Sequence, residues 1–323
     1  MPEIITMGEL LVDFIPEEKD CKLKSVNKFT KAAGGAPANV AVALSRLGKS
    51  CGFIGKIGND PFGDFLLEVM KEQNVDTTQI IHTEEAMTTL AFVSLTKEGE
   101  RDFAFYRKPG ADILLNKNEI DIHYLKSARI FHFGTISLTN EPVRSTTHYL
   151  LKEANKNDIY ITFDPNIRLP LWEGNLDELK KQFELVLPYV DLIKMNYDEL
   201  ILLSNKDKLN IAEGKYDEKE IAILARKILA KGPNFAIITA GSDGSYFVSK
   251  ENLLYKKAEE IKAVDTTGAG DSFMAGVIYK LSNISLENID WQEVLELANK
   301  FGAITSKSYG AIPSLPTNKD LNQ

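Results

Sequence analysis

Cysteine is scarce in this sequence, which has only Cys21 and Cys51 among its 323 residues. Two cysteines without metal-ligand spacing exclude a disulfide framework, so we expect both to be reduced thiols. No run of about 18 apolar residues occurs, which excludes a membrane-spanning helix. The opening stretch MPEIITMGELLVDF carries acidic residues where a signal peptide carries positive charge. We therefore expect a cytoplasmic protein with no membrane partner.

Positive charge is also in the minority. The sequence has 38 lysines and arginines against 46 aspartates and glutamates, which gives a net charge of −8. This balance argues against a phosphodiester backbone, so no nucleic acid partner is expected. Several common motifs are missing as well. SRLGKS lacks the first glycine of a Walker A loop, where Ala43 stands, and GAGDSF lacks the third glycine of a dinucleotide fingerprint. No G-x-S-x-G elbow occurs, and the 4 histidines show no zinc spacing.

The sequence does contain an alternation of short β-rich apolar runs with longer amphipathic helical patterns. This alternation predicts one layered α/β domain over residues 1–323 with a mostly parallel central sheet. In such sheets, ligands bind beyond the carboxyl ends of the strands, which is where we expect a site. The expected strands are IITMG, CGFIGKIG, ARIFHFGTI, IYITFD, VDLIKMN and FAIITAG, and the expected helices include APANVAVALSRLG, PFGDFLLEVMKEQ and EPVRSTTHYLLKEANKN.

Two segments, from about 12–33 and 88–110, interrupt this rhythm with extended chain of period-2 alternation and carry no helical pattern of their own. The second predicts a hairpin that turns at TKEGER, with Gly99 in the turn. Together the two segments predict a small antiparallel flap that stands off the main domain. A flap beside a ligand crevice is a candidate lid.

The stretch DTTGAGDSF, Asp265 to Phe273, precedes an apolar helical pattern. Gly268 and Gly270 remove side chains that would block a close approach, and the free amides at the helix start suit the charge that develops in phosphoryl transfer. Yet the loop ends in the carboxylate of Asp271, which repels a phosphate. Asp271 is therefore either a general base that accepts a proton or only the N-cap of the helix, where Asp is favoured.

A second glycine-rich stretch is KAAGGAPANVAVALSRLG. Gly34 and Gly35 permit either close approach to a ligand or only tight helix packing. Asn39 lies one turn into the predicted helix and offers both a donor and an acceptor, which suits a sugar hydroxyl. Asp13, at the end of the first strand region, is suited to accept hydrogen bonds from a polyol.

Other polar residues follow the predicted strands. Arg107 lies at the far end of the flap hairpin. Asp164, Asn166 and Arg168 lie at the carboxyl end of the strand predicted at IYITFD and immediately beyond it. A crevice is expected there, although an arginine is equally suited to a surface charge or a salt bridge.

Two further strand ends carry candidate residues. Lys194, Asn196 and Glu199 stand where a strand gives way to a helix, and Glu199 either favours the helix dipole or organises water around magnesium. A turn at another strand end contains Thr239, Gly241 and Gly244. This turn either admits a nucleotide or is only a hairpin turn.

Together these stretches resemble the ribokinase-like, or phosphofructokinase-B, family of sugar kinases over nearly the whole chain, from GELLVDF to GAIPSLPT. The two glycine signatures carry the resemblance, with the N-x-x-E of Asn196 and Glu199 between them. GGAPANVAVALSRLG, FYRKPGADILL and FDPNIRLPLW are most similar to fructokinases. The resemblance implies a three-layer α/β/α fold with a small β-sheet lid.

The resemblance also implies roles. Asp271 would be the base for the 6-hydroxyl of D-fructose as it attacks the γ-phosphate of ATP, with an anion hole made by the amides of Gly268, Ala269, Gly270 and Asp271. The implied sugar-binding residues are Asp13, Gly34, Gly35, Asn39, Arg107 and Arg168. Those of the nucleotide site are Lys194, Thr239, Gly241, Gly244 and Asn299. Asn196 and Glu199 would organise Mg²⁺ through water, and a possible K⁺ site would use Asp265, Thr267, Ser308, Gly310 and Ser314.

The resemblance further implies ATP and Mg²⁺ as cofactors and a homodimer formed through the lid. Alternatives stay open at this stage. The substrate is fructose, 2-keto-3-deoxygluconate, another sugar or a nucleoside, because Arg168 suits acidic and neutral sugars alike. A non-catalytic sugar-binding protein is opposed by Asp271 and the intact glycine loop. Tyr309 interrupts the usual small-residue run near the implied potassium site.

Overall fold

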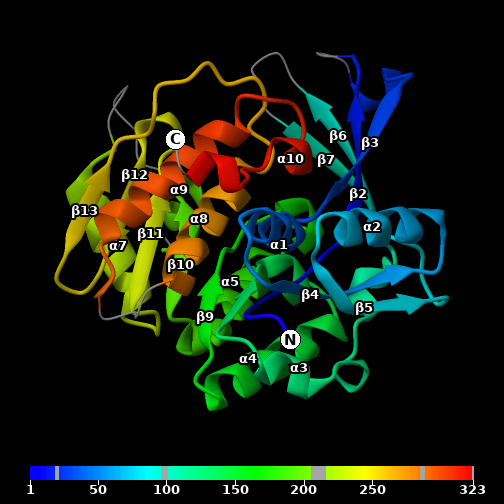
Figure 1. The fold of residues 1–323 in the computed structure, drawn as a ribbon, viewed down its shortest axis with the longest axis horizontal. Coiled ribbons are helices and arrows are strands. Elements are labelled where there is room, and N and C mark those ends of the chain that lie inside the picture. Colours follow the sequence, from blue (N-terminus) through cyan, green and yellow to red (C-terminus); the bar gives the residue numbers. More distant parts are fainter. Residues whose placement is uncertain (19–21, 96–100, 205–215, 284–287, 322–323) are drawn as a thin grey trace.

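The computed structural model describes residues 1–18, 22–95, 101–204, 216–283 and 288–321. Its main body is a nine-stranded sheet in the order β13-β12-β11-β10-β9-β8-β1-β4-β5 (Figure 1). From β11 to β5 in that order, neighbouring strands pair in parallel. The pairs β11–β12 and β12–β13 are antiparallel. Their bounds are β1 (Ile4–Met7), β4 (Cys51–Gly58), β5 (Asp76–Thr83), β8 (Ile130–Phe133), β9 (Tyr160–Phe163), β10 (Leu192–Asn196), β11 (Phe235–Thr239), β12 (Ser245–Val248) and β13 (Leu253–Lys256).

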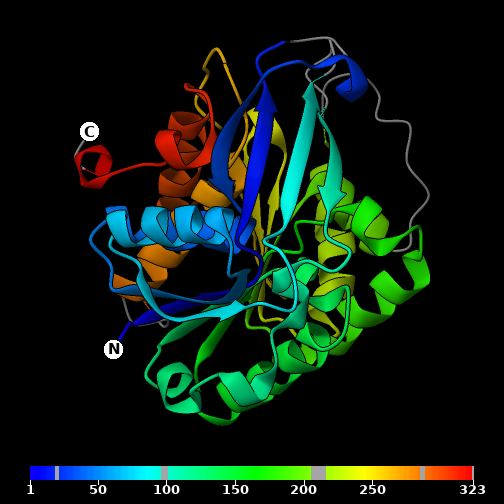
Figure 2. The same ribbon diagram turned by 90° about the vertical axis from the view of Figure 1, so that its right-hand side faces the viewer.

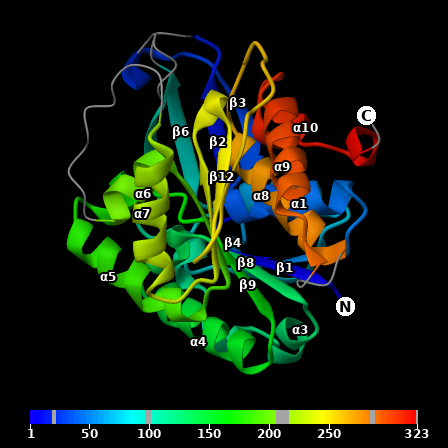
Figure 3. The same ribbon diagram turned by 90° about the vertical axis from the view of Figure 1, so that its left-hand side faces the viewer.

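Helices cover both faces of this sheet, which confirms the predicted three layers (Figure 3). Alternate residues of a strand belong to different cores, as Ile4 and Ile5 of β1 do. This explains why the strands are continuous apolar runs. One face carries α1 (Ala36–Arg46), α2 (Pro61–Glu72), α8 (Ala269–Asn283) and α9 (Trp291–Thr305), and the other carries α3 (Ile122–Lys126), α4 (Val143–Lys156), α5 (Leu176–Val186), α6 (Tyr197–Leu203) and α7 (Glu218–Leu229).

A second, small sheet stands off the main body (Figure 2). Its strands are β3 (Phe29–Gly34), β2 (Leu11–Pro16), β6 (Leu90–Leu95) and β7 (Arg101–Tyr106), in that order. The expectation of a wholly antiparallel flap is wrong at the centre, where β2 and β6 pair in parallel. Both strands leave the main body in the same direction, so they meet side by side without a hairpin between them. The predicted turn at Gly99 lies outside the described residues, as does Cys21.

The structure also describes one of the two cysteines and a histidine in the central sheet. Cys51 is a buried free thiol, and His132 is a buried residue of β8. Burial lowers the pKa of His132 to about 4, so this histidine is neutral at physiological pH. In the described parts of the chain, no helix combines the length and apolar character needed to cross a bilayer.

Candidate active site

A cavity of about 910 Å³ lies between the small sheet and the carboxyl ends of the central strands. This is where ligands bind in open parallel sheets. The predicted site residues that line it are Asp13, Gly35, Asn39, Arg168, Lys194, Asn196, Glu199, Thr239, Gly241, Gly244, Thr267, Gly268, Ala269, Gly270, Asp271 and Asn299. Six others do not line it: Gly34, Arg107, Asp265, Ser308, Gly310 and Ser314.

The glycine loop meets α8 at the cavity wall. Because α8 begins at Ala269, Asp271 is its third residue, and the reading of Asp271 as an N-cap is wrong. The amide of Ala269 donates to the carbonyl oxygen of Thr266 at 3.2 Å. Within the described residues, the amides of Gly268, Gly270 and Asp271 have no acceptor in the protein. Three of the four amides expected to form an anion hole are therefore available to an anion.

Asp271 is buried, and two asparagines hold its carboxylate. Asn39 donates from Nδ2 to Oδ2 at 2.7 Å, and Asn166 donates from Nδ2 to Oδ1 at 3.3 Å. Burial raises the pKa of Asp271 to about 6, the Asn39 bond opposes this, and the charge of Asp164 adds to it. Such a carboxylate is mostly ionised at neutral pH and still accepts a proton readily, which suits a general base.

Lys194 lies beneath the glycine loop in a buried ion pair. Its Nζ donates to Oδ2 of Asp164 at 2.9 Å, and a Cβ on Gly270 would lie 3.1 Å from the same Nζ. Burial lowers the pKa of Lys194, but the nearby carboxylates, Asp164 first, outweigh it and raise that pKa above its usual value. Lys194 is thus a permanent positive charge beside the open amides. The second oxygen of Asp164, Oδ1, is buried and has no partner among the described residues.

Glu199 and Asn196 form a capping box at the start of α6. Each side chain accepts the other residue's amide, at 2.9 Å and 2.8 Å, and Glu199 also accepts the amide of Ile167 at 2.8 Å. Burial raises the pKa of Glu199, and Asp164 adds to the effect. Because both Glu199 oxygens already accept amides, the pair fits a hydrated magnesium ion contacted through water better than direct ligation. Structurally, Glu199 fixes the segment that carries Asn166 and Arg168.

The two positions before α1 require glycine for different reasons. A Cβ on Gly34 would lie 2.2 Å from Oδ2 of Asp13, so this glycine makes room for the Asp13 side chain. A Cβ on Gly35 would lie 2.2 Å from the carbonyl oxygen of Glu9, and Gly35 has a φ of 112°, which disfavours a side chain. Both glycines therefore shape the end of the cavity beside the small sheet, Gly34 without lining it.

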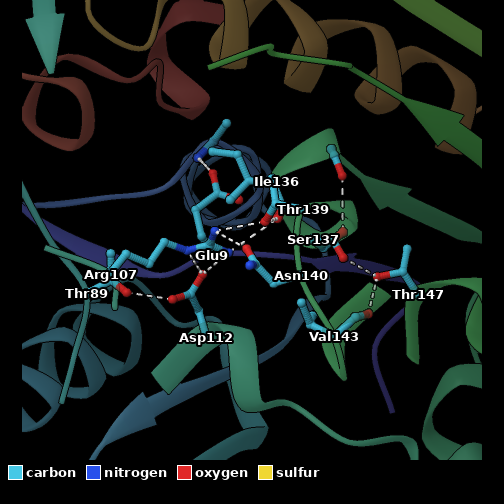
Figure 4. A network of polar contacts seen from close by, with 12 residues as sticks. Glu9, Thr89, Arg107, Asp112, Ile136, Ser137, Thr139, Asn140, Val143 and Thr147 are labelled. Atoms are coloured by element: carbon cyan, nitrogen blue, oxygen red, sulfur yellow. Dashed lines mark hydrogen bonds and ion pairs between the residues drawn. The ribbon is translucent and has the colours of Figure 1, made fainter. Parts of the chain in front are cut away.

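Arg107 does not line the cavity. Its guanidinium is buried in an ion pair with Asp112 (Figure 4), where Nη2 lies 2.7 Å from Oδ2, and it also donates to Thr139 Oγ1 at 2.8 Å. Of the alternatives that the sequence left open for an arginine here, the geometry therefore supports a salt bridge for Arg107. Arg168, in contrast, lines the cavity, and its charge lowers the pKa of Asp271.

At the other end of the cavity, the turn after β11 is both a hairpin turn and a cavity wall. It joins β11 to β12, and Thr239, Gly241 and Gly244 all line the cavity. Gly244 packs so closely that a Cβ would lie 2.2 Å from the carbonyl oxygen of Lys256. Asn299 donates to that same carbonyl at 3.1 Å. The two alternatives for this turn therefore do not exclude each other.

The implied potassium residues gather around one loop. Asp265 Oδ1 accepts the amide of Thr267 at 2.9 Å, and its Oδ2 accepts the amide of Gly310 at 2.9 Å. Ser314 donates to the carbonyl oxygen of Tyr309 at 3.2 Å. Asp265 thus ties the glycine loop to the segment before α10 (Ala311–Ser314). In the described residues, no group of three or more His, Cys, Asp or Glu side chains is arranged to hold a metal ion.

Sequence reasoning did not identify Glu9 and Phe105 as cavity residues and assigned no role to Asp164. Glu9 follows the central strand β1 and lines the cavity, a place that the strand-end rule already marks. Asp164 was noted at a strand end without a role. Phe105, on β7, lines the cavity from the lid, and no motif in the sequence signals it.

A mostly parallel α/β sheet, a cavity at its carboxyl edge and a buried carboxylate beside open amides fit the class of phosphotransferases that the resemblance to ribokinase-like sugar kinases implies. Residues 1–318 match the pfkB family of carbohydrate kinases, and the chain belongs to this family. It is 39% identical to a probable chloroplastic fructokinase-6 of Arabidopsis thaliana over 100% of this chain and 82% of that protein. It is an enzyme, a carbohydrate kinase similar to fructokinases.

Solved structures agree with this assignment. A sugar kinase of Pyrococcus horikoshii in complex with ATP matches with a TM-score of 0.85 and 32% identity, over 98% of this chain and 96% of that one. A fructokinase of Vibrio cholerae with fructose, ADP and calcium bound matches with a TM-score of 0.84 and 29% identity, over 99% of this chain and 98% of that one.

Proposed function

We propose that this protein transfers the γ-phosphate of ATP to the 6-hydroxyl of D-fructose. The observation that carries the proposal is the place of Asp271, buried in the first turn of α8 beside the open amides of Gly268 and Gly270. A proton acceptor and an anion site at one point are what an attacking hydroxyl and a transferring phosphoryl group need. The family and the similarity to fructokinases support the sugar.

The reaction balances with these groups. As the sugar oxygen attacks the γ-phosphorus, its O–H bond breaks and the proton passes to a carboxylate oxygen of Asp271. The new O–P bond forms while the bond between the γ-phosphorus and the bridging oxygen breaks, and ADP leaves with that electron pair. Lys194 and the open amides stabilise the charge that grows on the phosphoryl oxygens.

Each end of the cavity has its own task in this proposal. Asp13, Asn39 and Arg168 bind the sugar at the lid end. ATP lies along the turn after β11 and beside Asn299. Asn196 and Glu199 would hold Mg²⁺, which would offset phosphate charge. The loop around Asp265 and Gly310 would hold K⁺. Initial rates in KCl that exceed those in tetramethylammonium chloride would support this potassium site, and equal rates would contradict it.

The test of the sugar is ATP consumption with magnesium over a panel of fructose, ribose, glucose, 2-keto-3-deoxygluconate, fructose 6-phosphate and adenosine. Phosphorus-coupled carbon NMR of the product then locates the phosphate. A strong preference for fructose with the phosphate on C6 supports the proposal, and phosphate on C1 contradicts it. Faster turnover of 2-keto-3-deoxygluconate favours the alternative that Arg168 permits. Silence with every compound, from folded protein, favours a sugar-binding protein without catalysis.

We also propose a homodimer formed through the lid. The outward face of the small sheet is aromatic: Phe14 and Phe92 stack at 4.8 Å, and Tyr106 beside them is 67% exposed. A second copy would cover this apolar face. Light scattering should give twice the mass of the chain, and Tyr106→Glu should shift it toward one chain. A wild-type monomer would contradict the dimer. Location in the cytoplasm stays a prediction, which fluorescence microscopy of a tagged protein tests.

A further inference from the structure

Glu9 lies where the lid joins the main body. It stands between β1 and β2, two residues before the lid strand begins. Its side chain is 3% exposed and lines the sugar end of the cavity. The proposed phosphoryl transfer does not use this carboxylate. A buried acid without a role in the chemistry needs another explanation.

The Glu9 carboxylate holds the start of α1. Its Oε1 accepts the amide of Ala36, the first residue of α1, at 2.7 Å. Gly35 packs against the backbone of Glu9, as its missing Cβ shows. β3 ends at Gly34, immediately before this junction. One side chain therefore joins the roots of β2 and β3 to the helix that carries Asn39, the partner of Asp271.

The roots of the other two lid strands meet in a second cluster of polar contacts, around Asp112 (Figure 4). Thr89, just before β6, donates to Oδ1 of Asp112 at 2.5 Å. Arg107, just after β7, donates from Nε to Oδ2 of Asp112 at 2.8 Å. Arg107 also reaches Thr139 and the carbonyl oxygen of Ile136 in the main body. Each of the four lid strands is thus anchored where it leaves the core.

The charges of this second cluster also act on Glu9. Burial raises the pKa of Glu9 to about 7, and the amides of Glu9 and Ala36 oppose the rise. Asp112 raises this pKa further and Arg107 lowers it. Because these two charges oppose each other, burial is the main cause of the raised pKa.

We propose that Glu9 is a positioning residue that ties the roots of β2 and β3 to the start of α1, so that these two lid strands and Asn39 adopt one arrangement over a bound sugar. Arg107 anchors the roots of β6 and β7 through Asp112 and does not line the cavity. The kinetic part of the test rests on the proposed sugar kinase function, whereas the structural part does not.

Amide hydrogen exchange of the sugar-free protein tests this anchoring by Glu9 without a measurement of enzyme activity. Glu9→Ala leaves the Ala36 amide without its acceptor, so exchange in β2, β3 and the first turn of α1 should quicken by about tenfold. Strands β9 to β11 should keep their rates. Asp191→Ala is a matched control, because it removes the acceptor of the Ile161 amide, which Asp191 binds at 2.8 Å at the amino ends of the strands, and it should leave the lid unchanged. Unchanged lid exchange in Glu9→Ala would overturn the proposal.

Kinetics separates positioning from a general defect. Glu9→Ala should raise the sugar KM by about tenfold and leave the ATP KM within about twofold, because the lost bond lies at the sugar end. Glu9→Gln should recover most of the sugar affinity, since its amide oxygen still accepts from Ala36. Equal losses for both substrates, or no recovery with Gln, would contradict the positioning role. If the wild type phosphorylates no sugar, the proposed function fails while the exchange experiment still decides the role of Glu9.

Discussion

Asn39 and Asp271 are separated by 232 positions in the sequence, yet their side chains meet at 2.7 Å inside the cavity. The bond joins α1 to α8, which pack together on one face of the sheet. It favours the ionised carboxylate, whereas burial favours the protonated one, and the balance leaves the pKa of Asp271 at about 6. Helix α1, which carries the proposed sugar ligand Asn39, and the proposed base on α8 are therefore held together by this bond.

Asp271→Asn should abolish most of the turnover and keep binding. The amide has nearly the shape of the carboxylate and cannot accept the hydroxyl proton, so kcat should fall by about 10²–10⁴-fold. Calorimetric titration should give sugar and ATP affinities close to those of the wild type. A variant with nearly normal kcat would remove the base from the mechanism and leave Asp271 only a structural role, through its bonds with Asn39 and Asn166.

The acid limb of kcat against pH should report Asp271. The base works in its ionised form, so kcat should fall as the pH drops through about 6. Asn39→Ala removes a bond that lowers the pKa of Asp271, and the limb should therefore move to higher pH. Measuring kcat at saturating sugar separates this shift from weaker sugar binding. An identical limb in wild type and Asn39→Ala would contradict the coupling.

The sequence predicted the elements well because each strand and helix carries a local pattern. The apolar runs of β1, β4 and β8 to β11 and the glycine stretches before α1 and α8 lie where those patterns placed them. What the sequence could not predict depends on contacts between distant segments. The parallel pairing of β2 with β6, the bond of Arg107 to Thr139 and the bond of Ala36 to Glu9 all join segments that are far apart in the sequence. An arginine after a strand looks the same in sequence whether it faces a ligand or an aspartate.

Gly34→Ala should weaken sugar binding specifically. The new Cβ would lie 2.2 Å from Oδ2 of Asp13, so the Asp13 carboxylate must move from its position on the cavity wall. The loss of one charge-assisted hydrogen bond to the sugar corresponds to a rise in sugar KM of about tenfold or more. The ATP KM should stay unchanged, and the melting temperature of the variant distinguishes this effect from misfolding. A normal sugar KM in a folded variant would show that Asp13 does not bind the sugar.

The buried pair of Asp164 and Lys194 should separate stability from activity. Lys194→Met leaves the Asp164 carboxylate buried without its partner, so the free energy of unfolding should fall by about 3–5 kcal/mol. Adding Asp164→Asn removes the unpaired charge and should restore much of that stability in denaturant titrations. Turnover should not return with it, because the positive charge beside Gly270 is still missing. Recovery of kcat in the double variant would mean that Lys194 only balances Asp164 and has no part in stabilising the phosphoryl group.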